Sequence, residues 1–236
     1  MPVPTPTYTS TYVPPAPTAI APLTGETVEV GALTHPALSA KVDNHPDARP
    51  QFALERADIV FEELVEGGIT RYVAIWHSDI PDEIGPIRSI RPMDPDIISP
   101  FGGLVAFAGG QQRFVDMMEA TPVRNVIHGF GDTDETMFRT DFHDSPHDLI
   151  VRASLVISRN LDLGPPAQQF AYSRDIASSS AVRDGEPIDG ISLVFSEATT
   201  PSWVWDATAG GYLRVQTDGA PDVDLLTATA NEYGAR

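Results

Sequence analysis

The sequence of 236 residues contains no cysteine. This absence excludes disulfide bonds, thiol nucleophiles and cysteine-ligated zinc sites. The sequence also lacks any apolar run approaching the roughly 20 residues that a membrane-spanning helix needs. Its first residues have neither the basic region nor the apolar region of a signal peptide, so none is predicted.

Basic residues are also scarce, with 15 Lys and Arg against 33 Asp and Glu, and the net charge is -18. Such a field repels nucleic-acid backbones and anionic membrane surfaces, so we predict no nucleic-acid partner. Lys41 is the single lysine and lies outside any glycine-rich loop, which excludes a P-loop. There is no nucleophile elbow and no dinucleotide fingerprint. We therefore predict no cofactor.

Proline and glycine divide the chain into three parts. Residues 1–22 are rich in Pro and Thr and are predicted to form a disordered tether. Residues 23–163 alternate strand and helix patterns, which predicts a mixed α/β domain. Residues 164–236 predict a smaller β-rich domain, with an aromatic hairpin at 202–206 and 211–215 and with last strands that are missing or close to the terminus. The expected class of the whole chain is α+β.

Within the first domain, residues 38–43 predict a strand. Continuous apolar stretches on either side of the Gly67-Gly68 turn, within 58–78, predict two central strands joined as a hairpin. The clearest helix is predicted over residues 147–161. Its apolar face is continuous, and Pro146 is well placed to begin it.

Three carboxylates precede the glycine turn: Glu62, Glu63 and Glu66. Strand alternation puts Glu63 on the more apolar face, where a buried carboxylate needs a partner, and arginine is the natural one. Two interpretations stay open. The pair is structural and fixes the turn, or it belongs to an acid–base site.

Two arginines, Arg88 and Arg91, lie on a loop stiffened by the flanking Gly85-Pro86 and Pro92. Guanidinium groups match the oxygens of phosphate, sulfate and carboxylate. We predict that these two arginines bind a small anion together with Arg71 and Arg139. Asp43 and Asn44, at the end of strand 38–43, complete the predicted ligand-binding set.

The histidines show no metal-binding spacing. His143 and His147 are four residues apart, but Pro146 interrupts a helix through both. His147, at the start of the predicted helix, could serve as a base, as a metal ligand or as a residue of the cap region. The prediction is that no metal is bound. A divalent cation near Asp141, Asp144 and Asp148 remains the alternative.

Several motifs together resemble the YerB-like bacterial lipoprotein family. They are DNHPDARPQ at 43–51, ADIVFE at 57–62, VEGGITR at 65–71, GPIRSIRP at 85–92, and a second cluster of Phe138-Arg139 with Ser145-Pro146-His147. Asp148 departs from the asparagine that usually follows Pro-His in this family. The resemblance implies an exported two-domain protein of unknown function. It would contact the membrane only through a lipid anchor absent from this chain.

Three hypotheses for function follow. The first is an extracytoplasmic domain that binds a small anionic or cell-envelope ligand through its arginines. The second is a hydrolase of an envelope polymer, in which Glu63 or Glu66 acts with His147 in acid–base roles and Asp43 orients them or binds a metal. The third is a surface scaffold that binds protein partners through the β-rich domain.

Overall fold

The computed structural model describes residues 16–129 and 133–222, so residues 1–15 of the predicted tether and the last fourteen residues lie outside it. Helices and several sheets are both present, which confirms the α+β class. The strands are β1 (Thr18–Ile20), β2 (Thr27–Glu29), β3 (Leu38–Asp43), β4 (Ile59–Leu64), β5 (Thr70–Trp76), β6 (Glu83–Ile84), β7 (Leu104–Phe107), β8 (Arg124–Ile127), β9 (Met137–Arg139), β10 (Leu149–Arg152), β11 (Gly190–Ser192), β12 (Ser202–Asp206) and β13 (Gly211–Val215). The helices are α1 (Asp94–Ile98), α2 (Gln112–Glu119), α3 (Thr133–Thr136), α4 (Ala153–Ser158) and α5 (Ser180–Asp184).

Short 3-10 turns connect several of these elements. They are η1 (Pro46–Ala48), η2 (Leu54–Arg56), η3 (Glu66–Gly68), η4 (Ser99–Phe101) and η5 (Ile176–Ser178). Turn η3 joins β4 to β5, and Gly67 and Gly68 within it have φ angles of 75° and 74°, a conformation that favours glycine. The glycine pair therefore forms the hairpin turn that the sequence predicts.

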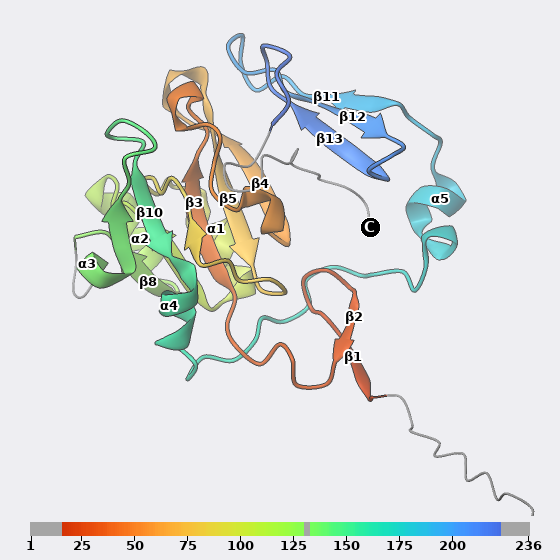
Figure 1. Cartoon of the computed structure of the whole chain (residues 1–236), viewed down its shortest axis with the longest axis horizontal. Coiled ribbons are helices and arrows are strands. Elements are labelled where there is room, and N and C mark those ends of the chain that lie inside the picture. The colour runs from red at the N-terminus through yellow and green to blue at the C-terminus, as the bar shows by residue number, and fades with distance from the viewer. Residues whose placement is uncertain (1–15, 130–132, 223–236) are drawn as a thin grey trace, which may run out of the picture.

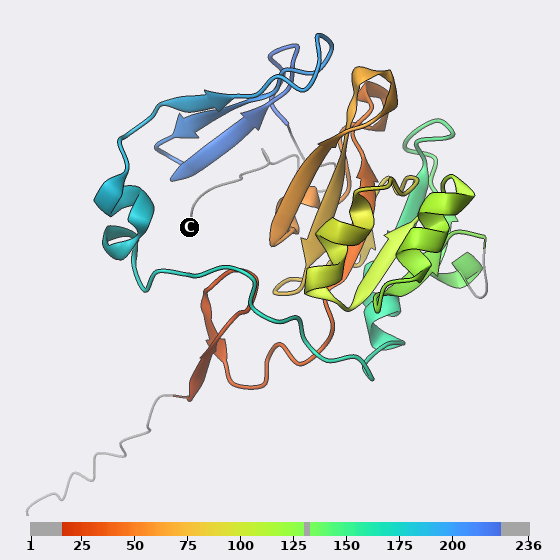
Figure 2. The same ribbon diagram turned by 180° about the vertical axis from the view of Figure 1, so that it is seen from behind.

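A five-stranded sheet in the order β4-β5-β3-β7-β8 forms the centre of the N-terminal domain. Strands β4, β5 and β3 pair antiparallel, whereas β3, β7 and β8 run parallel. Helices α1 and α2 cover one face, and β10, α4 and their small sheet cover the other (Figures 1 and 2). Every residue of β3 and β5 is buried, because both faces of these central strands are covered.

The parallel pair β3 and β7 is split at its carboxyl end. The two strands pair only where Leu38–Ala40 meet Leu104–Ala106. Beyond that point residues 86–90 lie between them, and the Arg88 amide donates to the Lys41 carbonyl at 2.8 Å. On its other side, the Arg88 carbonyl accepts from Ala108 N at 2.9 Å. The arginine loop is thus held by backbone hydrogen bonds at the edge where the parallel strands end.

Two local predictions are wrong. The segment 147–161 is not one helix, because Leu149–Arg152 form β10 and only Ala153–Ser158 are helical. The apolar run of β10 is buried between β6 and β9, and such a run fits a buried strand as well as a helix face. In addition, Thr18–Ile20 of the predicted tether pair with β2.

The C-terminal sheet, in the order β11-β12-β13, contains the predicted aromatic hairpin. Trp205 lies opposite Tyr212, with ring centroids 5.2 Å apart. This sheet approaches the β4–β5 hairpin (Figures 1 and 2), where Arg214 forms an ion pair with Glu62 at 2.6 Å. Among the described residues, no helix is long and apolar enough to cross a membrane.

Candidate functional site

Charged residues gather where β3 ends. Arg71 of β5 lies between two cross-strand neighbours, Asp43 of β3 and Glu63 of β4. Lys41 precedes Asp43 by two residues and therefore projects from the same sheet face. This face is the one covered by α1, so the helix, the sheet and the 86–90 segment enclose the group.

Lys41 is fully buried and contacts two carboxylates, Glu63 and Asp94, the latter at 2.7 Å. The prediction that an arginine is the partner of Glu63 is therefore wrong, because the single lysine occupies that place. Burial raises the pKa of Glu63 to about 7, while Lys41 opposes this rise and Asp94 adds to it. Asp94 also accepts the Arg91 backbone N–H. This network fixes the start of α1 to the sheet and leaves Glu63 little contact with solvent.

Arg71, Arg88 and Arg91, which we call the arginine cluster, meet beside this network. Arg71 and Arg91 both donate to the Ser89 carbonyl, at 3.0 and 3.2 Å. Arg91 also pairs with Glu66 at 2.6 Å. Burial, together with the neighbouring Arg91 cation, lowers the pKa of Arg71 to about 10. Within the part of the chain that the structure describes, the Arg71 Nε atom has no hydrogen-bond partner.

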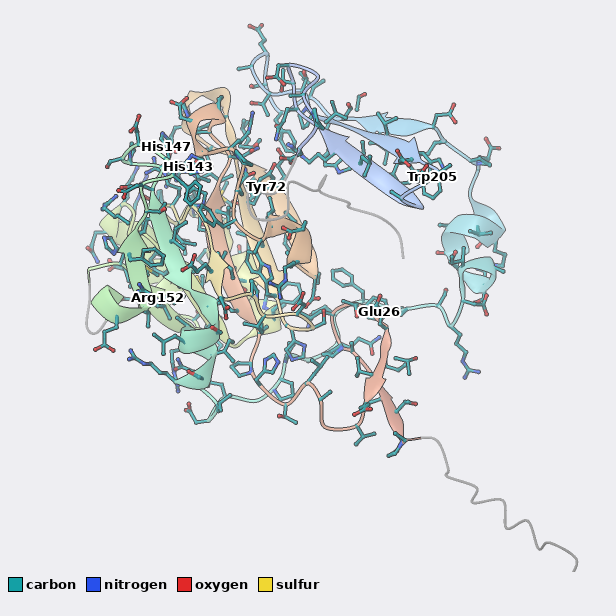
Figure 3. All side chains as sticks on the ribbon, viewed as in Figure 1. Glu26, Tyr72, His143, His147, Arg152 and Trp205 are labelled. Carbon is teal, nitrogen blue, oxygen red and sulfur yellow. The ribbon has the colours of Figure 1, made fainter. Side chains whose placement is uncertain are left out.

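Asp43 links the arginine cluster to the histidines. Its Oδ2 atom lies 2.9 Å from Arg88 Nε and 2.7 Å from His147 Nδ1, and its Oδ1 accepts from His45 N at 3.1 Å. Arg88 also donates to the Pro146 carbonyl at 3.0 Å. The rings of His45 and His147 are stacked, with centroids 4.7 Å apart. Figure 3 shows His147 and His143 at the same end of the N-terminal domain.

His147 differs from its prediction, since it does not begin a helix. It precedes β10 in a loop, and α4 begins only at Ala153. What holds the imidazole is the Asp43 carboxylate. Because a carboxylate only accepts, Nδ1 carries the proton and Nε2 of the neutral ring keeps its lone pair for another partner. The contact joins residues 104 positions apart, and no short-range spacing signals it.

Asn44 lies in an internal network of polar side chains. Its amide nitrogen donates to Thr70 Oγ1 at 2.7 Å, and its amide oxygen accepts from Arg49 Nε at 2.9 Å. Gln51 donates to the Asp43 carbonyl at 3.1 Å. Arg49 and Gln51 were missed as candidates, although both belong to the DNHPDARPQ motif. Their role in the structure is to shape the chain after β3.

Arg139 lies apart from the arginine cluster. It pairs with Asp148 where β9 and β10 meet, and half of its side chain is exposed. Among the described residues its ion-pair partner is Asp148, and no described contact joins it to Arg71, Arg88 or Arg91. The predicted set of four arginines therefore divides into a group of three and one that is separate.

One group of side chains in the described part of the chain has the donor atoms and spacing for a metal ion. It consists of His45, Asp47 and His147, whose ligand atoms lie within 4.8 Å of one another. Asp141, Asp144 and Asp148, which the sequence suggested as alternative ligands, are not members. The site thus contains two neighbouring groups of side chains. The arginine cluster could bind an anion, and the nitrogen and oxygen donors of His45, Asp47 and His147 could bind a metal ion.

Comparison with known proteins identifies relatives. Residues 23–163 match the N-terminal domain of DUF3048, a protein of unknown function. The chain is 35% identical over 127 residues to "Putative lipoprotein YerB" of Bacillus subtilis (strain 168), which covers 54% of this chain and 38% of that protein. The crystal structure of YerB from Bacillus subtilis matches with a TM-score of 0.77 and 24% identity, over 91% of this chain and 72% of that one, a likeness of fold. The chain therefore belongs to the DUF3048 family, whose function is unknown.

Proposed function

We propose that this protein binds a small anionic ligand through the arginine cluster. The observation that carries the proposal is the gathering of three guanidinium groups at the carboxyl end of the parallel strands. Arg88 pairs there with Asp43 and Arg91 with Glu66, and no ion pair of Arg71 is found among the described residues. In open sheets with parallel strands, ligands characteristically bind at this edge.

Arg71 is the group that gains most from an anion. It is 7% exposed, it faces the like charges of Arg88 and Arg91, and its Nε is unpaired among the described residues. A buried cation with an unused donor is unfavourable by itself. An oxyanion bound beside the arginine cluster would offset the repulsion between the guanidinium groups.

The remaining charge of the chain favours a small ligand. With a net charge of -18, the protein repels long polyanions at a distance. A phosphate, sulfate or carboxylate group fits two guanidinium forks without extending across the acidic surface. We therefore favour a single oxyanion group, free or at the end of a larger envelope molecule.

The location that we propose is extracytoplasmic, with attachment to the membrane through a lipid anchor. The name of the Bacillus subtilis relative, which calls it a putative lipoprotein, supports this location. A ligand from the cell envelope would then be the one within reach.

Calorimetric titration with inorganic phosphate, sulfate and citrate tests the proposal. Arg88→Gln and Arg91→Gln each remove one charge-assisted hydrogen-bond donor and should weaken binding of the preferred anion about tenfold or more. The matched control is Arg124→Gln, since Arg124 pairs with Asp162 at the amino end of β8. This is the end of the parallel strands opposite to the one that holds the arginine cluster. The proposal fails if no anion binds, or if all three variants bind like the wild type.

The contact between Asp43 and His147 favours a hydrolase as the second candidate. A buried carboxylate that holds Nδ1 leaves Nε2 as a base, an arrangement used in acyl and phosphoryl transfer. Glu63 is enclosed with Lys41, and Glu66 is paired with Arg91, so His147 would be the base. Hydrolysis of p-nitrophenyl esters that survives His147→Gln unchanged would exclude this role, whereas its loss there and not in Glu66→Gln would support it.

A further inference from the structure

We propose that His45, Asp47 and His147 bind a zinc-class divalent cation, with Asp43 positioning the ligands. The inference goes beyond anion binding by the arginine cluster and does not rest on it. Two imidazole nitrogens and one carboxylate oxygen form a set of three protein ligands, which leaves a fourth position for water or substrate.

The spacing of two of the donors already fits such a cation. His45 Nδ1 and Asp47 Oδ2 are 3.5 Å apart. Tetrahedral bonds of about 2.0–2.1 Å place neighbouring ligand atoms about 3.3 Å from each other. All three ligand atoms lie within 4.8 Å, so closure needs a shift of about 1–1.5 Å. The Asp47 side chain is 74% exposed and free to supply much of that shift.

The local chain brings His45 and Asp47 together. His45 caps turn η1, where its Nδ1 accepts the Asp47 backbone N–H at 3.2 Å. The lone pair of His45 Nδ1 therefore points toward Asp47. A cation bound there would replace a weak hydrogen bond by a metal–nitrogen bond, and the Asp47 amide would face the exposed side of the turn.

Asp43 supplies the second, independent observation. It is almost fully buried, contacts His147 Nδ1 through Oδ2, and accepts the His45 backbone N–H through Oδ1. Histidine ligands of metals characteristically donate their other ring N–H to a carboxylate, which fixes the ring and raises the basicity of the ligating nitrogen. His147 has this partner before any metal binds. Arg88 Nε lies 2.9 Å from the same carboxylate oxygen, so the Asp43 charge compensates the guanidinium group near the proposed cation.

The donor types select the metal. Imidazole nitrogen with one carboxylate suits Zn²⁺, Co²⁺ and Fe²⁺, whereas Mg²⁺ and Ca²⁺ prefer oxygen ligands in larger number. We expect Zn²⁺ to bind and Mg²⁺ not to compete with it. Because cysteine is absent from the chain, no thiolate can act as the competing soft ligand.

The test is titration of the tag-free protein with Zn²⁺ against a chromophoric chelator, with Co²⁺ absorption as a report of ligand geometry. One equivalent should bind to the wild type. His45→Ala and His147→Ala should each weaken binding at least 100-fold, and Asp43→Asn should weaken it about 10–100-fold while leaving both ligands in place. The matched control is His143→Ala, whose imidazole lies in the same loop and contacts the Pro50 carbonyl but is not in the set.

Two results would overturn the inference. One is Zn²⁺ binding that is absent, or that is equal in wild type, His45→Ala and His147→Ala. The other is an affinity that falls only in His143→Ala. Should a variant fail to fold, ring ¹⁵N spectra of the wild-type protein give the answer directly. Zn²⁺ must then shift the nitrogen signals of His45 and His147 and leave those of His143 unchanged, and any other pattern counts against the site.

Discussion

Replacing Glu63 by glutamine should change the pH dependence of stability in a direction that the buried lysine network dictates. Glu63 lies on the covered face of the sheet with Lys41 and Asp94, two carboxylates to one ammonium group. Burial raises the pKa of Glu63 from 4.5 to about 7. Glutamine has nearly the shape of the protonated side chain and does not titrate, so the variant isolates this one ionisation.

The magnitude follows from linkage. The raised pKa belongs to the folded state, so folding takes up a proton between the two pKa values. The stabilisation from Glu63 is complete below pH 4.5 and is lost as the pH rises through about 7. Each pKa unit corresponds to about 1.4 kcal/mol. Between pH 4.5 and about 7, the ionisation of Glu63 therefore lowers the free energy of unfolding of the wild type by about 3 kcal/mol. The free energy of unfolding of Glu63→Gln, measured relative to that of the wild type, should rise by the same amount as the pH increases from 4.5 to about 7.

Urea denaturation at several pH values between 4.5 and about 8 measures the difference between the two proteins. Glu66→Gln is a control of opposite sign, because the hydrogen bond from Arg91 lowers the pKa of Glu66. Its contribution is lost as the pH falls, so, unlike that of Glu63→Gln, its difference from wild type should stay nearly constant as the pH rises toward 7. Parallel stability curves for wild type and Glu63→Gln would refute the reasoning.

Three further predictions concern other parts of the fold. Gly103→Ala should lower the free energy of unfolding by at least about 2 kcal/mol more than Gly102→Ala in urea denaturation, because both have a positive φ but only at 103 would a Cβ collide with a backbone carbonyl oxygen. Arg214→Met should cost about 3–5 kcal/mol in the same assay, because it leaves the buried Glu62 carboxylate without its cation. Burial lowers the pKa of His77 to about 4, so its NMR ring signals should stay those of a neutral imidazole at about pH 5. The neutral His77 side chain therefore stabilises the folded state, and this contribution to the free energy of unfolding should be lost only as the pH falls from 6.5 through about 4.

Local sequence patterns predicted those features that depend on neighbouring residues. The continuous apolar stretches and the glycine pair predicted β4, β5 and their turn, and the aromatic alternation predicted the hairpin of β12 and β13. The stiff loop with Arg88 and Arg91 was also recognised. In each case the information lies within about ten residues, which is the range over which periodicity and turn chemistry act.

The rest depends on contacts between distant residues. Leu149–Arg152 form a strand because β6 and β9 pair with them, and nothing in their own composition separates that outcome from a helix. Lys41 replaces the expected arginine partner of Glu63 because the sheet register places both on one face. Periodicity carries no information on such pairings, so the meeting of His45 with His147 could not be predicted either.

The insertion of residues 86–90 between β3 and β7 has a consequence for amide hydrogen exchange. The amides of Asp43, Arg88, Ile90 and Ala108 all donate to backbone carbonyls of this inserted ladder. These amides should exchange only when the whole sheet opens, since no edge of the ladder is free to fray separately. An anion or cation bound at this edge would raise the free energy of opening of the whole sheet by RT ln(1 + [L]/Kd), where [L] and Kd are the concentration and dissociation constant of that ion. Exchange would then slow throughout the sheet, and the occupancy of the site could be measured at amides far from the bound ion.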